Sequence, residues 1–294
     1  MMLPAKYYGK IILFGEYTIL KGGTGFVIPY SNVFGFFDYL DPASSPKQHQ
    51  SNADLQNFLK YLQNIEGINI QAFEKDLKKG LFFKSNIPSG YGVGSSGALV
   101  AGVFERYCLN KHTLQSDLTE SKKYLAKMES FFHGTSSGID PLCCFIQKPL
   151  MFRGPEIIVF DKVSTERTGL FLLDSGQKRS TDDFIKIFTK KCKDEKFCKI
   201  IDEQLMKSNL ECVNNFNLRD NPKLKENFEI ISRIQYEQFN EMIPTHIQPL
   251  WIRGLETGQF YLKLCGSGGG GYMIGLSSVA KEKLEVDFPL IWLS

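Results

Sequence analysis

Glu129 and Asp140 are the acidic residues whose spacing in this sequence best suits chemistry. Glu129 lies near the end of a predicted helix, and a small-residue loop over residues 134–138 leads from it to Asp140. Two carboxylates eleven residues apart across a tight turn can divide two tasks. One can hold a metal ion while the other accepts a proton. Taken alone, an aspartate before Pro141 would be read as a turn residue.

A loop rich in glycine and serine, PSGYGVGSSGA over residues 88–98, has the composition of a phosphate-binding loop. Glycines let backbone N–H groups approach an anion closely. The predicted helix that follows adds its unpaired N–H groups and the positive end of its dipole. Ser95 and Ser96 can cap this helix, and one of the two hydroxyls could also bind Mg²⁺. The alternative is a flexible turn with a serine cap and no ligand.

The same loop matches two nucleotide-binding patterns only poorly. The Walker A pattern GxxxxGK[ST] is absent. The dinucleotide pattern GxGxxG does match at Gly92, Gly94 and Gly97, but such a match alone is weak. A dinucleotide-binding fold would leave the other unusual segments unexplained, and Pro88 breaks the tight strand-to-loop entry that this fold needs.

Two further segments suggest contact with a ligand. Residues 266–271, GSGGGG, are glycine at five of six positions between two predicted strands. Because glycine weakens regular elements, this composition indicates backbone that must lie against a ligand. Lys10 opens an apolar strand that Gly15 and Glu16 close. Lone charges at strand ends are usually solvated, so this segment gains meaning only beside the others.

The elements that would hold these groups are predicted from hydrophobic periodicity. Strands are predicted at 7–14, 26–40, 68–73, 81–84, 156–160, 170–173, 260–264 and 272–276, and helices at 55–65, 98–109 and 116–132. Residues 41–52 are predicted as a polar loop, and Gly134 as a helix C-cap. After residue 173, helices are expected to about residue 256. One apolar stripe in them is expected in the core: Leu224, Phe228, Ile231, Ile234 and Phe239.

Composition limits the classes of partner. The 294 residues suggest about two domains. The net charge of +3 is too small to imply nucleic acid or an anionic membrane. No apolar run reaches the roughly 20 residues of a membrane span, and the N-terminus lacks a signal peptide, which predicts a cytoplasmic protein. Seven cysteines without a C-x-x-C pair, with four histidines, predict buried thiols rather than disulfides or zinc.

Taken in order, these segments resemble the motifs of the GHMP kinase superfamily. GKIILFGE (9–16) resembles its first motif, GYGVGSSGALVAGV (90–103) its phosphate-loop motif, and LCGSGGGG (264–271) its third. HGTSSGID (133–140) and DSGQKRST (174–181) are similar to segments of mevalonate kinases in particular. The chain departs from those kinases at three positions: Tyr17 replaces a histidine, Ser136 a proline and Gly97 an alanine.

The resemblance implies an α+β, two-domain GHMP kinase fold, with ATP and a small alcohol bound in a cleft between the domains. A ribosomal-protein-S5-like domain would span 1–155, and a ferredoxin-like domain with the glycine loop 156–294. Asp140 would accept the hydroxyl proton beside Lys10, while Ser96 and Glu129 would hold Mg²⁺. The phosphate-binding residues would be Pro88, Gly90, Gly92, Gly94, Ser95, Ser96 and Gly97. The substrate-side residues would be Glu16, Tyr17, Arg179, Thr181, Gly266 and Gly268.

The activity that the resemblance implies is ATP-dependent phosphorylation of a hydroxyl, with mevalonate favoured, a step of isoprenoid precursor synthesis. A phosphomevalonate kinase or a sugar kinase is the nearest alternative, and Lys178 beside Arg179 could serve a phosphorylated substrate. Lys10 argues against the related diphosphate decarboxylase, which lacks that lysine. A non-catalytic binding relative is disfavoured because Lys10, Glu129 and Asp140 are intact. A homodimer is left open.

Overall fold

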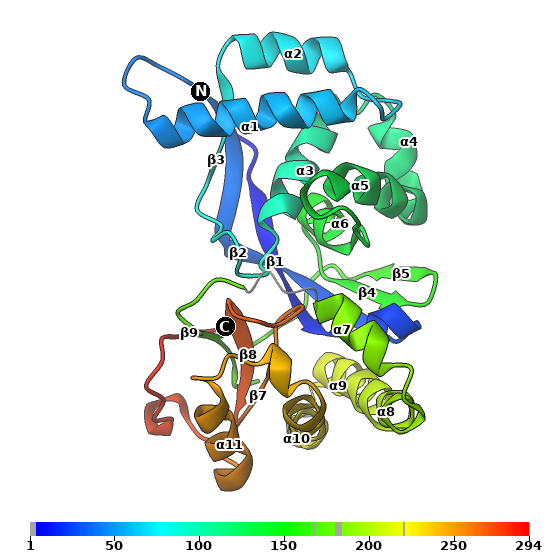
Figure 1. Cartoon of the computed structure of the whole chain (residues 1–294), viewed down its shortest axis with the longest axis vertical. Helices are drawn as coiled ribbons and strands as arrows, with labels where there is room; N and C mark the ends of the chain where they lie inside the picture. Colours follow the sequence, from blue (N-terminus) through cyan, green and yellow to red (C-terminus); the bar gives the residue numbers. More distant parts are fainter. Residues whose placement is uncertain (1–3, 167, 180–183, 220, 294) are drawn as a thin grey trace. The chain divides into compact units, whose positions relative to one another are not determined.

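A computed structural model describes residues 4–166, 168–179, 184–219 and 221–293 (Figure 1). The chain divides into two compact units, and neither is contiguous in sequence. The first unit comprises Met1–Ile11, Ile28–Pro88 and Val93–Lys148, and the second comprises Ile12–Val27, Ser89–Gly92 and Pro149–Ser294. Strands β1 (Tyr7–Phe14) and β2 (Gly25–Tyr39) contribute residues to both units because each strand crosses a unit boundary.

The first unit combines part of a sheet with six helices among its described residues. The end of β2 pairs antiparallel with β3 (Leu81–Ser85), from Gly35 opposite Ser85 to Tyr39 opposite Leu81. The helices are α1 (Pro46–Leu62), α2 (Ile70–Lys78), α3 (Ser95–Tyr107), α4 (Lys111–Ser116), α5 (Leu118–His133) and α6 (Ile139–Ile146). Helices α3, α5 and α6 pack on one another. Their ends carry most of the residues predicted to act in catalysis.

The second unit contains two antiparallel arrangements of strands. The start of β2 pairs with β4 (Leu150–Arg153), which pairs with β5 (Glu156–Val159). A separate four-stranded sheet has the order β7-β8-β6-β9. Its strands are β6 (Leu170–Asp174), β7 (Phe260–Leu264), β8 (Tyr272–Ser277) and β9 (Leu290–Trp292). The glycine loop connects β7 to β8.

Helices fill the chain between β6 and β7. They are α7 (Phe184–Lys191), α8 (Glu195–Ile200), α9 (Met206–Leu218), α10 (Asn221–Gln238) and α11 (Gln248–Thr257). The predicted apolar stripe is buried, with Phe228 and Phe239 both 0% exposed. The stripe therefore belongs to the core, as predicted.

Most predicted elements are confirmed, and two predictions are wrong. Residues 68–73 are not a strand, because Asn69 caps α2 by accepting a hydrogen bond from the Ala72 N–H at 3.0 Å. The loop predicted over 41–52 is too long, because α1 already begins at Pro46. Ser45 and Gln48 form a capping box there, and proline suits the first helical position. Strands β4 and β9 were not predicted.

The two compact units do not coincide with the predicted domains, which meet at a single boundary between residues 155 and 156. Residues 12–27 and 89–92 group with the C-terminal part of the chain, because β1 and β2 run through both units. Two sequence-contiguous domains, 1–155 and 156–294, therefore stay a prediction. The ribosomal-protein-S5-like and ferredoxin-like domain types likewise stay predictions.

Candidate active site

Lys10 and Asp140 form an ion pair inside the first unit. Lys10 lies on β1 and Asp140 in the first turn of α6, and Lys10 Nζ is 2.7 Å from Asp140 Oδ2. The lysine side chain is 2% exposed and the aspartate side chain 31%. A buried ammonium depends on its carboxylate partner, whereas the aspartate keeps part of its surface open to solvent. Asp140 is thus held by Lys10 and is still accessible to a small molecule.

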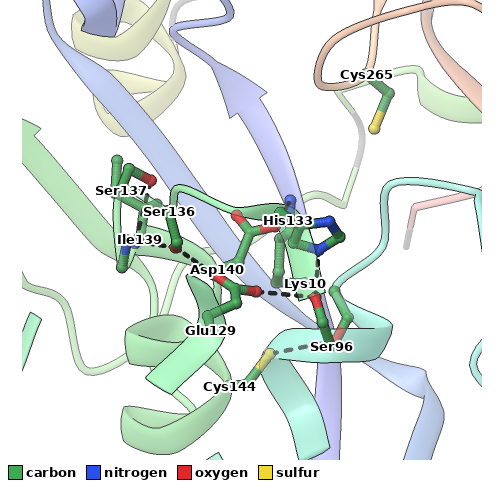
Figure 2. Close-up of polar contacts among 12 residues, drawn as sticks. Lys10, Ser96, Glu129, His133, Ser136, Ser137, Ile139, Asp140, Cys144 and Cys265 are labelled. Atoms are coloured by element: carbon green, nitrogen blue, oxygen red, sulfur yellow. Dashed lines mark hydrogen bonds and ion pairs between the residues drawn. The ribbon is translucent and has the colours of Figure 1, made fainter. Parts of the chain in front are cut away.

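Glu129, near the end of α5, is held by two serine hydroxyls (Figure 2). The Ser96 hydroxyl donates to Glu129 Oε1 at 2.9 Å, and the Ser136 hydroxyl donates to Oε2 at 2.5 Å. His133, one helical turn after Glu129, places Nε2 3.0 Å from Ser96 Oγ. With Glu129 ionised, Ser96 gives its only proton to the carboxylate, so His133 donates to Ser96. Helix α5 thus presents Glu129 and His133 together to the start of α3.

The proton affinity of Glu129 is raised by its surroundings. Burial and the negative charge of Asp140 raise its pKa to about 7, although Ser136, Ser96 and Lys10 act in the opposite direction. The cluster holds two carboxylates and one ammonium, an excess of negative charge that a divalent cation would neutralise. Ser96 Oγ and Glu129 Oε1 are oxygen donors of the kind that Mg²⁺ prefers. These residues therefore fit Mg²⁺.

Such an ion would take its other ligands from outside the side chains. Within the ranges that the structure describes, no three His, Cys, Asp or Glu side chains are grouped to hold a metal. Mg²⁺ commonly keeps several waters and binds substrate phosphates through one or two protein carboxylates. Two protein ligands, Ser96 and Glu129, are consistent with this mode of Mg²⁺ coordination.

The start of α3 lies against the start of α6. A Cβ atom at Gly97 would be 3.0 Å from the Asp140 carbonyl carbon, so a side chain there would require the backbone of α6 to shift by a few tenths of an ångström. This close approach explains glycine where the resemblance leads one to expect alanine. The loop before α3 is fixed beside Lys10, whose backbone N–H donates to the Val93 carbonyl at 3.0 Å. The helix start, Lys10 and Asp140 therefore form one site.

Glu16 lies in the second unit, where its carboxylate forms a buried ion pair with Lys263. Lys263 Nζ is 2.5 Å from Glu16 Oε1, and both side chains are 1% exposed. Lys263 also donates to the Leu264 carbonyl at 2.9 Å. Burial raises the pKa of Glu16, and the Lys263 charge opposes this shift. The pair ties the segment after β1 to β7, and contact of Glu16 with substrate stays a prediction.

Arg179 lies between two glycine-containing loops of the second unit. Its backbone N–H donates to the Gly90 carbonyl at 2.9 Å, and its Nη2 donates to the Cys265 carbonyl at 2.8 Å. A Cβ atom at Gly92 or Gly266 would come within 1.9 or 2.1 Å of Nη2, so the guanidinium lies directly against the backbone of both loops. Its Nε is buried and has no hydrogen-bond partner among the described residues.

The predicted site residues thus fall into two groups. Lys10, Ser96, Glu129 and Asp140 gather in the first unit. The described residues that are predicted on the substrate side lie in the second unit, where Tyr17 contacts the glycine loop and Arg179 contacts both glycine-containing loops. Thr181 lies outside the described residues.

Three residues of these groups were missed as site residues: His133, Ser136 and Lys263. His133 follows Glu129 by four positions on a predicted helix, and this spacing could have identified it. Ser136 lies in the loop that delivers Asp140, without a pattern of its own. Lys263 stands in the apolar strand FYLKL, and only the folded structure shows that it meets a carboxylate.

Comparison with known proteins identifies the fold. Residues 55–148 match the family model described as GHMP kinases N terminal domain. The solved structure of L. major mevalonate kinase in complex with R-mevalonate is similar over 96% of this chain and 89% of its own. The sequence identity is 18% and the TM-score 0.64. The chain has the GHMP kinase fold. No curated protein sequence matches it.

Two other structures with the GHMP kinase fold carry names that imply different acceptors. Streptococcus pneumoniae phosphomevalonate kinase is 16% identical, with a TM-score of 0.59, over 94% of this chain and 92% of its own. Lactococcus lactis galactokinase complexed with galactose is 16% identical, with a TM-score of 0.60, over 93% and 84%. The predicted α+β class and GHMP kinase fold are confirmed, and these similarities leave the acceptor open. Across the described part of the chain, no helix combines the length and apolar character needed to span a bilayer.

Proposed function

We propose that this protein is a kinase that transfers the γ-phosphoryl group of ATP to the hydroxyl of a small molecule. The observation that carries the proposal is the Lys10–Asp140 ion pair at 2.7 Å, close to the Ser96–Glu129 oxygen pair. Phosphoryl transfer requires positioning and neutralisation of charge more than covalent chemistry from the protein. A buried lysine, two carboxylates and a helix N-terminus supply these functions in one unit.

The start of α3 would bind the phosphates of ATP. The first N–H groups of a helix have no partner inside it, and the helix dipole favours an anion there. Gly94, the N-cap residue, has no side chain to satisfy these groups. Gly94, Ser95, Ser96 and Gly97 would thus form the phosphate-binding end, with Pro88, Gly90 and Gly92 in the loop before it.

Ser96 and Glu129 would hold Mg²⁺, which when bound neutralises phosphate charge and orients the phosphates. Ser136 supports this assignment because it anchors the second oxygen of Glu129. His133 supports it because its hydrogen bond fixes the orientation of the Ser96 hydroxyl.

Asp140 would accept the proton of the acceptor hydroxyl as its oxygen attacks the γ-phosphorus. Lys10 holds this carboxylate in place through the ion pair, and its charge would lower the pKa of a hydroxyl bound beside it. The partial exposure of Asp140 supports this role, because a general base must reach the proton that it removes.

We further propose mevalonate as the acceptor. The support is the HGTSSGID segment and Arg179, whose guanidinium would pair with the single carboxylate of mevalonate. Thr181 would add a hydroxyl contact. Phosphomevalonate is the second candidate, because the exposed Lys178 next to Arg179 could pair with an additional phosphate.

A coupled ADP-release screen over mevalonate, phosphomevalonate and common sugars tests these proposals. Mevalonate is expected to release ADP with a KM in the ordinary range of about 1 μM to 1 mM. Arg179→Ala should raise that KM far more than the KM for ATP, whereas Lys178→Ala should leave mevalonate turnover unchanged. Turnover of a sugar or of phosphomevalonate, with none of mevalonate, would overturn the acceptor alone. No ADP release with any acceptor would overturn the kinase proposal.

A further inference from the structure

Tyr17 occupies a strained turn directly after β1. Its φ is 64° and its ψ −38°. The Thr18 N–H donates to the Glu16 carbonyl across it at 2.8 Å, which makes Tyr17 the centre of a γ-turn. A bulky residue at positive φ costs free energy and persists only where surrounding contacts fix it. The contacts of the Tyr17 side chain are therefore expected to hold this turn in place.

Those contacts point to the glycine loop, residues 266–271. Tyr17 is 6% exposed, and its ring centroid lies 4.9 Å from that of Phe188 and 5.2 Å from that of Phe239. Its hydroxyl donates to the Ser267 carbonyl oxygen at 2.5 Å. The ring is immobilised by two aromatic neighbours, so the hydroxyl is a fixed donor toward the loop.

The glycine loop depends on such external contacts for its shape. Its five glycines all have positive φ, from 72° to 137°. Glycine reaches that region easily but also reaches many others, so the loop has little conformational preference of its own. Carbonyls at alternate positions 265, 267 and 269 accept hydrogen bonds from the side chains of Arg179, Tyr17 and Gln177.

Tyr17 is the most buried of these three donor residues. Gln177 is exposed and Arg179 half-buried, whereas Tyr17 is buried.

We propose that Tyr17 is a positioning residue that sets the conformation of the glycine loop through the Ser267 carbonyl, without contacting the acceptor. This explains why a buried tyrosine stands where related kinases carry a histidine. Its kinetic consequence rests on the proposed kinase function, whereas its structural consequence does not.

Hydrogen exchange of the substrate-free protein tests the proposal with Tyr17→Phe, which keeps the ring and removes only the hydroxyl. Amides of residues 266–271 are expected to exchange about tenfold faster, the effect of losing one hydrogen bond. Tyr261→Phe is the matched control. It removes an equally buried hydroxyl of the same unit, which donates to Glu229 at 2.7 Å and not to the loop. Ser267→Ala keeps the accepting carbonyl and should leave loop exchange unchanged.

Kinetics supply the second readout. Tyr17→Phe should lower kcat about tenfold for whichever acceptor is turned over, with the acceptor KM within about twofold. Unchanged loop exchange in Tyr17→Phe would overturn the proposal, and a raised acceptor KM would then place the hydroxyl against the substrate. If no acceptor is phosphorylated, the proposed function fails, and the exchange comparison still decides the role of Tyr17.

Discussion

Two buried lysine–carboxylate pairs, one in each unit, have similar geometry and different surroundings. Lys10 and Asp140 lie 2.7 Å apart with side chains 2% and 31% exposed, whereas Lys263 and Glu16 lie 2.5 Å apart and are each 1% exposed. The pair in the first unit keeps one carboxylate within reach of a ligand, and the pair in the second unit keeps none. The two pairs differ in the exposure of the carboxylate more than in residue type or distance. Only the pair with a partly exposed carboxylate is a candidate for catalysis, and the other pair stabilises the fold.

The two pairs also differ in the charges around them. Glu129 adds a second carboxylate beside Lys10 and Asp140, and burial together with the Asp140 charge raises its pKa. Lys263 instead satisfies one carboxylate and a backbone carbonyl. The first cluster has an excess of negative charge and is therefore expected to bind a cation, whereas the charges of the second pair balance each other.

The largest effect is expected on stability from Lys263→Met. The substitution leaves the Glu16 carboxylate buried without its ammonium, which should lower the free energy of unfolding by about 3–5 kcal/mol. Denaturant unfolding measures this loss. The double variant Glu16→Gln/Lys263→Met removes both charges and should recover part of it. If the single and double variants lost the same free energy of unfolding, the unpaired Glu16 charge would not be the cause of the loss.

Asp140→Asn should act most strongly on activity. Loss of the general base should lower kcat by about 10² or more, while nucleotide affinity stays near that of the wild type. The unfolding midpoint should also fall, because the buried Lys10 ammonium loses its carboxylate partner. Steady-state kinetics and nucleotide titration check both parts. Asp202→Asn is the control, because Asp202 also pairs with a lysine, Lys21 at 2.6 Å, but outside the cluster. A kcat near normal in Asp140→Asn would remove Asp140 from the mechanism.

Ser96→Ala is expected to have a smaller, metal-dependent effect. Removal of one of two protein oxygens should raise the Mg²⁺ concentration for half-maximal rate by about tenfold, with partial rescue at excess Mg²⁺. Ser95→Ala, at the adjacent position, is the matched control and should leave the Mg²⁺ curve in place. A shift in Ser95→Ala alone would transfer the metal contact to Ser95.

The smallest effect is a pH dependence of stability. The pKa of Glu129 is about 7 in the folded protein, above its ordinary value of 4.5, so the folded state binds this proton more tightly than the unfolded chain. Its contribution is therefore full below about pH 4.5 and is lost as pH rises through about 7. Denaturant unfolding of the metal-free protein at pH 5, 6, 7 and 8 should show this decline, and Glu129→Gln should reduce it. Glu120→Gln changes an exposed glutamate and should keep the decline in stability. If the decline were unchanged in Glu129→Gln, a group other than Glu129 would be its cause.

Elements with a clear apolar pattern could be predicted from the sequence. Strand β1 was predicted at residues 7–14 and is observed there, and Gly134 ends α5 at φ 72° as expected of a C-cap. Residues 68–73 were assigned incorrectly because a short apolar run does not separate strand from helix, and the Asn69 cap decides the outcome. Strands β4 and β9, of four and three residues, were not predicted.

The candidate site could be predicted only where its residues lie in local motifs. Ser96, Glu129 and Asp140 belong to such segments, and the structure brings them together with Lys10. The Glu16–Lys263 pair joins positions 247 residues apart, and no periodicity in the sequence relates them. The direction of the Tyr17 side chain likewise depends on packing against distant aromatic residues.

The most direct measurement is phosphorus NMR of a reaction that contains the protein, Mg²⁺, ATP and mevalonate. The wild-type protein should convert the γ-phosphate of ATP into a new phosphomonoester resonance, with one ADP formed per ester, and the Asp140→Asn variant should form neither at a comparable rate. Two results would contradict the assignment of the Lys10–Asp140 pair to phosphoryl transfer. One is the absence of any phosphorylated product from mevalonate, phosphomevalonate or sugars with folded, nucleotide-bound protein. The other is undiminished product formation by the Asp140→Asn variant.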